Sequence, residues 1–312
     1  MASDVKLTLG PLLFNWPADM WSDFYARIAD EAPVDRVVIG ELTCSKRLPH
    51  YADRIPAAVE RLQRAGKTVI FASLILVTLE RERRASAELL GAAEADVEIN
   101  DLTLMNWVDD ATRFSVGPFV NVYNEATLAF LARKGAHLIC VPTELPFSEI
   151  ETLAKAATDL NVDLEVWAYG RVPLAISARC YHARAHGLAK DSCQFVCGYD
   201  LDGRAVDTID GQAFLAINGV QTLSYNHCNL IRDLDRLAAA GVHSLRLSPH
   251  SDDLVAVAHI FRDVLDGRLD KDEALRRLQK NAPDAVFSNG FMFGSAGAEG
   301  LANCRADPVQ AR

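Results

Sequence analysis

Four of the seven cysteines in this 312-residue sequence stand at spacings that suit a shared metal site. Three of them form the pattern Cys180-x12-Cys193-x3-Cys197, and Cys44 stands far upstream. Four thiolates bind either Zn²⁺ or a cubane iron–sulfur cluster. Structural zinc sites usually draw ligands from closely spaced pairs, whereas wide spacing suits the larger iron–sulfur core. The residues therefore favour an iron–sulfur cluster, with zinc or unligated thiols as the alternatives.

The other three cysteines are not expected to bind metal. Cys140 lies in an apolar run, where a thiol is a small buried hydrophobic side chain, and this interpretation also fits Cys228 and Cys304. No signal peptide is visible after Met1, so we expect a cytoplasmic protein. The cytoplasm is reducing and the cysteine count is odd, which argues against a disulfide framework.

Polar side chains that directly follow apolar runs are candidates for a substrate pocket. Glu41 and Glu144 are the strongest, because a carboxylate just beyond a buried strand needs a partner or a ligand. With Asn121 and Tyr123 they form our set of catalytic candidates. The wider set is Glu41, Asn100, Asp101, Asn121, Tyr123, Asn124, Glu144, Tyr169, Arg171 and Ser248. Such residues also cap helices and close turns, so none identifies a reaction by itself.

The elements that must position these residues alternate between short apolar runs and amphipathic segments. The predicted strands are Lys6–Leu9, Arg36–Ile39, Thr68–Ala72, Asp96–Asn100, Phe114–Gly117, His137–Val141, Leu164–Ala168 and Ser244–Leu247. The predicted helices include Met20–Glu31, Asn124–Lys134, Phe147–Leu160 and Leu230–Ala240. Near-continuous apolar strands that alternate with helices indicate parallel pairing. Eight such units predict a single α/β domain resembling a (β/α)8 barrel, with an open doubly wound sheet as the alternative.

The seventh unit is abnormally long. About 75 residues separate its strand from the eighth, whereas a βαβ unit needs roughly 30. We therefore predict a cysteine-bearing insertion after the seventh strand, at about residues 170–230, over the C-terminal ends of the strands. Within it, Asn218-Gly219 separates two β-like runs, Phe214–Ile217 and Val220–Leu223, as in a two-residue hairpin. The domain is expected to span 1–297, followed by a disordered tail at 298–312.

Composition and motifs argue against several classes of protein. A net charge of −10 disfavours nucleic acid as a partner. The longest apolar run, Val69 to Leu79, falls far short of the roughly 20 residues of a membrane span. Gly66-Lys67-Thr68 lacks the first glycine of a phosphate loop and precedes a strand. His182 and His186 are four residues apart and are interpreted as solvated or capping side chains.

A set of longer strings covers the chain from about Lys6 to Gly294. They are Gly40-Glu41-Leu42-Thr43-Cys44-Ser45-Lys46-Arg47, Asn121-Val122-Tyr123-Asn124, Pro142-Thr143-Glu144-Leu145, Ser177-Ala178-Arg179-Cys180, Asn218-Gly219-Val220-Gln221-Thr222 and Arg246-Leu247-Ser248-Pro249. Together with Cys193 and Cys197, they resemble the UbiV family, a branch of the group first called collagenase-like peptidases. Thr143 stands where many members of the wider group have arginine, which argues against a peptidase activity borrowed from the group's name.

This resemblance implies a 4Fe-4S cluster held by Cys44, Cys180, Cys193 and Cys197. It implies a heterodimer with a homologous UbiU-type subunit that hydroxylates the aromatic ring of ubiquinone precursors without molecular oxygen. Prephenate as the oxygen donor, a lipid-carrying accessory protein and a polyprenyl aromatic substrate are implied in the same way. The alternatives are a peptidase of the wider group and a non-catalytic, metal-stabilised partner subunit.

Overall fold

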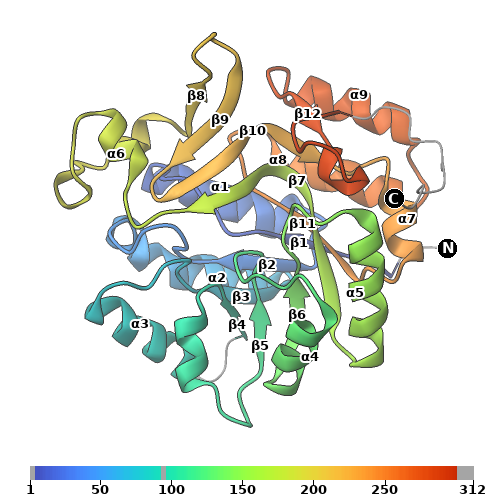
Figure 1. The fold of residues 1–312 in the computed structure, drawn as a ribbon, viewed down its shortest axis with the longest axis horizontal. Helices are drawn as coiled ribbons and strands as arrows, with labels where there is room; N and C mark the ends of the chain where they lie inside the picture. The colour runs from blue at the N-terminus through green and yellow to red at the C-terminus, as the bar shows by residue number, and fades with distance from the viewer. Residues whose placement is uncertain (1–3, 93–95, 301–312) are drawn as a thin grey trace.

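The fold is a closed parallel barrel in a computed structural model that describes residues 4–92 and 96–300 (Figure 1). The strands follow the order β11-β1-β2-β3-β4-β5-β6-β7, and β11 pairs with β7 to close the ring. This confirms the predicted (β/α)8 architecture. The barrel strands are β1 Lys6–Leu9, β2 Arg36–Ile39, β3 Thr68–Ala72, β4 Asp96–Ile99, β5 Phe114–Val116, β6 Ala136–Cys140, β7 Asp163–Ile176 and β11 Ser244–Leu247.

Helices surround the barrel, between successive strands and after the last barrel strand, β11. They are α1 Ala18–Glu31, α2 Ile55–Arg64, α3 Glu80–Gly91, α4 Glu125–Arg133, α5 Phe147–Asp159, α7 Leu234–Ala239, α8 Leu254–Leu265 and α9 Lys271–Asn281. Local sequence explains their ends: the Asn124 side chain accepts a hydrogen bond from the Thr127 N–H at the start of α4. Beyond α4, Gly135 adopts a φ of +106° that other residues rarely adopt. Between β4 and β5 a 3₁₀ segment, Leu102–Trp107, replaces a longer helix.

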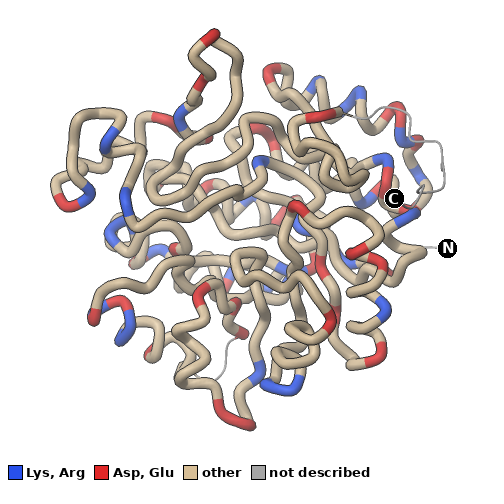
Figure 2. The backbone as a smooth tube through the Cα atoms, in the orientation of Figure 1, with Lys and Arg blue, Asp and Glu red and all other residues tan. Residues whose placement is uncertain are grey.

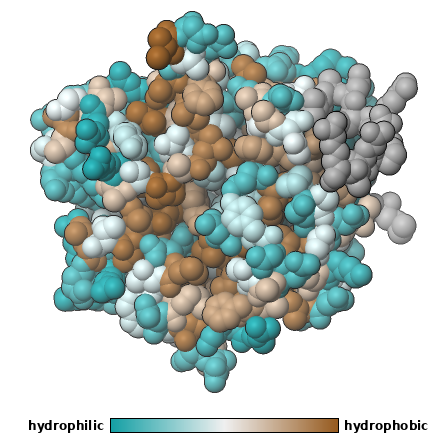
Figure 3. Space-filling view, viewed as in Figure 1, coloured by the Kyte–Doolittle hydropathy of each residue, from teal (hydrophilic) through white to brown (hydrophobic). Residues whose placement is uncertain are grey.

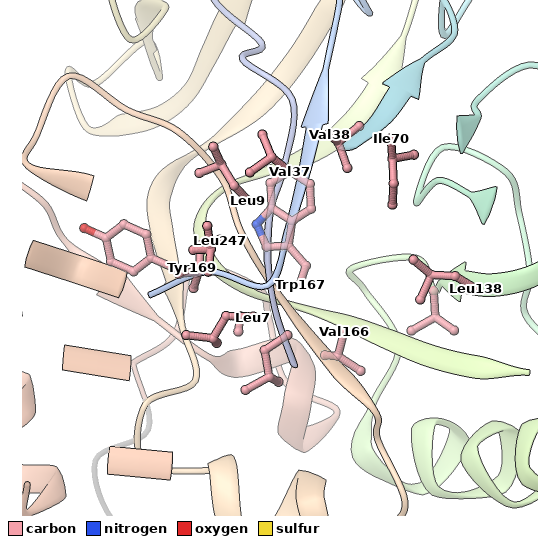
Figure 4. Packing of buried hydrophobic residues seen from close by; sticks show 14 of the residues in the cluster. Leu7, Leu9, Val37, Val38, Ile70, Leu138, Val166, Trp167, Tyr169 and Leu247 are labelled. Atoms are coloured by element: carbon pink, nitrogen blue, oxygen red, sulfur yellow. The ribbon is translucent and has the colours of Figure 1, made fainter. Parts of the chain in front are cut away.

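The barrel strands are buried on both faces. Figure 4 shows Leu7, Val37, Trp167 and Leu247 packed together from four different strands. Burial on both faces is why these strands appear in the sequence as short, nearly continuous apolar runs.

A polar network occupies the barrel interior, where apolar branched side chains are usual. Arg246 of β11 is fully buried and donates to the carboxylates of Glu165, at 2.6 Å, and Glu98. The Ser244 hydroxyl donates to Glu165 (2.7 Å) and also hydrogen-bonds the Thr8 hydroxyl (2.9 Å). The charge of Arg246 and these donors lower the pKa of Glu165 against the effect of burial.

Strand β7 is shared between the barrel and the insertion. Its first part pairs in parallel with β6 and β11, and its second part pairs antiparallel with β10. Gly170, with a φ of +103°, lies where the first part meets the second. The insertion contains α6 Tyr181–Ala185, β8 Arg204–Asp207, β9 Ala213–Asn218 and β10 Gln221–Asn229, and β12 Phe287–Ser288 pairs with β10.

The hairpin predicted in the insertion exists, but its turn lies one residue later than expected. Asn218 pairs with Gln221 in the β9–β10 ladder, so the turn is Gly219-Val220 and not Asn218-Gly219. Gly219 takes the positive φ of +61° that such turns require. Asn218 stays in the strand because its side chain is fully buried and hydrogen-bonded to Arg47.

The predicted tail falls mostly on residues 301–312, which lie outside the described residues, as does Cys304. Residues 298–300 are described and contact the domain: the Asn289 N–H donates to the Glu299 carbonyl at 3.0 Å. In the part of the chain that is described, every helix is too short or too polar to cross a membrane. Figure 2 shows acidic and basic residues interspersed around the molecule.

Candidate functional site

The four candidate cysteines meet at one narrow pocket. Cys44 follows β2, and Cys180 immediately precedes α6. Cys193 directly follows the 3₁₀ turn Lys190–Ser192, and Cys197 lies in the next 3₁₀ turn, Val196–Tyr199. The sequence separates these residues by up to 153 positions, yet barrel closure and the insertion bring them together. The lining of the pocket is Cys44, Arg47, Cys180, Ala183, Lys190, Cys193, Phe195, Val196, Cys197, Gly219 and Val220.

The run from Cys44 to Arg47 connects the pocket to three other parts of the molecule. The Ser45 hydroxyl donates to Glu82 of α3 at 2.6 Å. Lys46 donates to the Lys190 carbonyl at 2.7 Å and thereby joins the Cys44 loop to the loop that carries Cys193. Arg47 turns inward toward the hairpin. Each side chain of the run after the cysteine therefore positions the loop that presents Cys44.

Arg47 is a buried cation in the wall of the thiol pocket. Its Nη1 donates to the Leu13 carbonyl (2.9 Å) and its Nη2 to Asn218 (2.8 Å), while its Nε is buried without a hydrogen-bond partner. Burial alone would lower the pKa of Arg47, but the neighbouring charges of Cys197 and Glu41 raise it. A fixed positive charge with a free N–H donor beside four thiols favours a negatively charged group in the pocket.

Glycine is required where the hairpin turn approaches this cation. A Cβ at Gly219 would lie 2.9 Å from Arg47 Nη2 and 3.1 Å from Thr43. The opposite wall also has unusual backbone, since Gln194 and Phe195 both have φ near +50°. Such conformations cost free energy in non-glycine residues and persist only where surrounding structure holds them. Here they lie between Cys193 and Cys197, and the Phe195 ring packs 4.4 Å from that of His50.

The chemistry of the donors fits a metal cluster. None of the six described cysteines forms a disulfide. Burial raises the pKa of Cys44 and of Cys180, which disfavours free thiolates there. Metal coordination removes this penalty because it replaces the thiol proton. Four thiols, a buried cation and an unpartnered N–H donor are therefore a suitable setting for a cluster with thiolate ligands.

Glu41 supports this site from behind. Its Oε1 accepts the backbone N–H groups of Thr43 and Cys44, each at 2.8 Å, and its Oε2 accepts the Tyr51 hydroxyl at 2.7 Å. Burial raises the pKa of Glu41. The expectation that this carboxylate needs a partner is met by the Cys44 loop, so Glu41 positions a candidate ligand.

The other catalytic candidates lie elsewhere. Tyr123 donates to Glu144, and both side chains are exposed, as is Asn121. Burial and this hydrogen bond raise the pKa of Tyr123 to about 12. Among the described residues, none of the hydrogen bonds of this exposed pair reaches the thiol pocket.

The two histidines after Cys180 differ from each other. His182 is fully buried, so its interpretation as a solvated side chain is wrong. Its Nε2 lies 2.9 Å from Asp200, while His186 is exposed and its Nε2 contacts Arg204 at 2.9 Å. The nitrogen and oxygen atoms of His182, His186 and Asp200 lie within 4.8 Å of one another, close enough for a metal ion. Such an ion would have to displace the Arg204 guanidinium.

The sequence matches one protein family over most of its length. The family model of peptidase family U32 matches residues 22–302. The chain belongs to peptidase family U32. The match includes all four pocket cysteines, and it agrees with the resemblance to the wider collagenase-like group.

Solved structures resemble this U32-family chain only distantly. An enolase from Agrobacterium radiobacter is 16% identical over 53% of this chain and 45% of its own, with a TM-score of 0.37. The match therefore spans less than half of the enolase. A chain of the tryptophan synthase complex from Pyrococcus furiosus is 10% identical over 91% of this chain and 100% of its own, with a TM-score of 0.41. Neither likeness carries a functional argument.

The family name raises the question of a protease triad, and one serine, histidine and aspartate do meet. Asp96 Oδ2 accepts the Ser115 hydroxyl at 2.9 Å and contacts His137 Nε2 at 2.8 Å. Ser115 is fully buried in β5, and its hydroxyl donates to Asp96 at 2.9 Å, while the longer 3.4 Å contact is to a His137 Nε2 that itself lies against Asp96. A triad needs an accessible nucleophile whose proton passes to histidine, so this trio is not one.

Proposed function

We propose that this U32-family protein holds a 4Fe-4S cluster on Cys44, Cys180, Cys193 and Cys197. As a UbiV-type subunit, it would act with a homologous UbiU-type subunit in oxygen-independent hydroxylation of ubiquinone precursors. The observation that carries the proposal is the convergence of four thiols from two distant segments around one pocket with a buried arginine. A polyprenyl aromatic substrate and a lipid-carrying accessory protein complete the proposed system.

The chain's own residues have defined roles in this proposal. When bound, the cluster supplies one-electron transfer. Arg47 would offset part of its negative charge, and its unpartnered Nε–H would be available to a cluster sulfur, while Glu41 and Lys46 position the two cysteine loops. Replacing a ring C–H by C–OH is a two-electron oxidation. An alcohol donor such as prephenate supplies the oxygen and takes up those two electrons when its own C–OH bond is replaced by C–H.

The insertion also offers a surface for a partner subunit. Large apolar side chains are exposed along it, from the end of β7 to the β8–β9 hairpin, and Figure 3 shows hydrophobic surface over this hairpin. Exposed apolar surface of this kind is typical of protein–protein contact sites. The exposed set in the insertion is Leu174, Tyr181, Tyr199, Leu201, Ile209 and Phe214. A UbiU-type partner that docks here would lie beside the thiol pocket.

Anaerobic purification with iron and sulfide analysis tests the cluster. We expect about four irons and four sulfides per chain, with broad visible absorption. Cys44→Ala should lose this absorption, while Cys140→Ala, which removes a buried thiol outside the pocket, should keep it. One zinc per chain without sulfide would refute the cluster.

The pathway is tested in cells that lack this protein. We expect ubiquinone to disappear only during growth without oxygen and to return with the wild-type gene but not with Cys44→Ala. Unchanged anaerobic ubiquinone would refute the assignment. Peptide cleavage by the cluster-free protein would support the peptidase alternative, and hydroxylation by the partner alone would support a non-catalytic role.

A further inference from the structure

A second pocket lies beyond the barrel part of β7, where its pairing with β11 ends, and it is built from residues that the thiol site does not use. Its volume is about 330 Å³, within the range typical of small-molecule sites. Polar walls come from Arg171, Asp202, His227 and Asp252, while Tyr225, Pro283 and Val286 contribute carbon surface. In parallel α/β folds, this face of the sheet is where binding sites form.

Arg171 is held rigidly in the pocket wall. Its Nη1 donates to the carbonyls of Ser224, at 3.1 Å, and Tyr225, and its Cζ lies 5.2 Å from the centre of the Tyr225 ring. Its Nε is buried without a partner, and its Nη2 makes no hydrogen bond with any described residue. Burial lowers the pKa of Arg171. An oriented guanidinium with unused N–H groups is suited to a carboxylate.

Two histidines line the pocket, and burial lowers the pKa of both, which disfavours a positive charge on either ring. The His250 Nδ1–H donates to the Ser248 carbonyl, and its Nε2 must accept the Arg171 backbone N–H, which fixes the neutral tautomer. Burial and the charge of Arg171 lower the pKa of His250 to about 3. His227 is also buried with a lowered pKa, and its Nδ1 has no partner.

Three carboxyl groups face this single cation. Asp252 accepts the Tyr169 hydroxyl at 2.6 Å on one oxygen, while its other oxygen is buried without a partner. Asp202 accepts the Ser251 N–H at 2.9 Å on one oxygen and the Ser251 hydroxyl on the other, and Asp284 is also among the lining residues. With Arg171 as the lone cation among the described lining residues, the pocket carries excess negative charge. A ligand that brings only a carboxylate would increase that excess.

The backbone is adapted to this arrangement. A Cβ at Gly170 would lie 2.7 Å from His250 Cε1 and 2.8 Å from Ser248 Cβ. Only glycine therefore allows β7 to pass close enough for Arg171 and His250 to hydrogen-bond.

We propose that this pocket binds a small zwitterion of the amino-acid type, with its carboxylate on Arg171, its ammonium group between Asp202 and Asp252, and an apolar side chain against Tyr225 and Pro283. This ligand satisfies the unused donor and the unpartnered carboxylate oxygen without adding net charge. The inference involves different residues from the proposed cluster, so either can fail without the other.

The pocket nevertheless lies near the thiol site. Asp202 follows Cys197 by five residues, so their Cα atoms are at most about 18 Å apart. The loop after β1 contacts both the thiol pocket and this second pocket. The Leu13 carbonyl accepts a hydrogen bond from Arg47, and the centre of the Phe14 ring lies 5.2 Å from that of His250. A ligand bound here would therefore sit beside the cysteine-bearing insertion.

Calorimetric titration of the full, metal-loaded chain with three matched probes tests the proposal. L-phenylalanine carries both charged groups, L-phenyllactate replaces the ammonium with a hydroxyl, and phenethylamine lacks the carboxylate. We expect L-phenylalanine to bind and each of the others to bind at least about tenfold more weakly. Absence of binding by all three, or tighter binding of L-phenyllactate, would overturn the proposed zwitterion.

Variants of the pocket residues test whether L-phenylalanine binds in this pocket. Arg171→Gln should weaken L-phenylalanine at least about tenfold, because it removes the charge that pairs with the carboxylate. Arg64→Gln, an exposed arginine of α2, should leave affinity unchanged. If circular dichroism shows that Arg171→Gln is unfolded, Asp252→Asn provides the test instead. It keeps an oxygen acceptor for the Tyr169 hydroxyl and should still weaken the binding of L-phenylalanine. Unchanged affinity in a folded pocket variant would refute the site.

Discussion

Replacing Glu41 by alanine should destabilise the Cys44 loop without removing any cysteine. The buried Thr43 N–H and Tyr51 hydroxyl lose their acceptor, at about 1–3 kcal/mol each. The Cys44 N–H is only partly buried, so water can take the place of the lost carboxylate acceptor. Losing this hydrogen bond should therefore cost about 1 kcal/mol. The sum is about 3–7 kcal/mol, which makes local loop opening roughly 10²- to 10⁵-fold more frequent.

The assay is the rate at which a ferrous chelator removes iron from anaerobically purified protein, with urea unfolding measured in parallel. We expect Glu41→Ala to release iron faster by orders of magnitude. Glu144→Ala is the matched control, because its carboxylate is exposed and should change stability by no more than about 0.5 kcal/mol. Wild-type iron release by Glu41→Ala would refute the positioning role. A Glu41→Gln variant with an intact cluster but no hydroxylation would instead make the carboxylate catalytic.

Three further predictions concern Arg47, Asp252 and the insertion surface. Arg47→Gln should lower the midpoint potential of the proposed cluster in a redox titration by on the order of 100 mV, since loss of a nearby positive charge disfavours the reduced state. Burial raises the pKa of Asp252 to about 6, so the folded state favours the protonated carboxyl. Its ionisation therefore lowers the free energy of unfolding by a growing amount as pH rises from about 4 to 6. Asp252→Asn should therefore gain up to about 3 kcal/mol in urea unfolding at pH 7.5 and little at pH 4; an equal gain at both would contradict this. Ile209→Asp should reduce co-purification with the proposed UbiU-type partner, whereas Leu160→Asp at the end of α5 should not.

The sequence predicted the barrel well because each strand is buried on both faces and so appears as a compact apolar run. Polar residues inside such runs were less informative. Glu98, Glu165 and Arg246 stand in three strands far apart in the sequence, and their charge pairing is visible only after closure. The seventh strand was predicted to end at Ala168, whereas β7 continues to Ile176 because β10 hydrogen-bonds its second part.

The candidate site was predictable to the extent that residue type reveals it. Cysteine spacing indicated the set that includes Cys44 and Cys193, and a carboxylate beyond a strand indicated Glu41. The environment of each candidate depends on tertiary contacts: Glu41 meets backbone donors, whereas Glu144 faces solvent. Arg171 was among the pocket candidates, but His227 was not, since a lone histidine in the insertion carried no local signal of the cavity it lines.

The continuity of β7 bears on the order in which the protein is assembled. The same strand closes the barrel against β11 and then forms the edge on which β10 pairs. The insertion is therefore anchored to the barrel by backbone hydrogen bonds that need no metal. Its cysteine-bearing loops connect strands and turns that form without a metal. Loading of the proposed cluster would then follow folding as a late, reversible step, so the metal-free protein should keep its barrel, lose order only around the thiols, and accept iron and sulfide again after chelation.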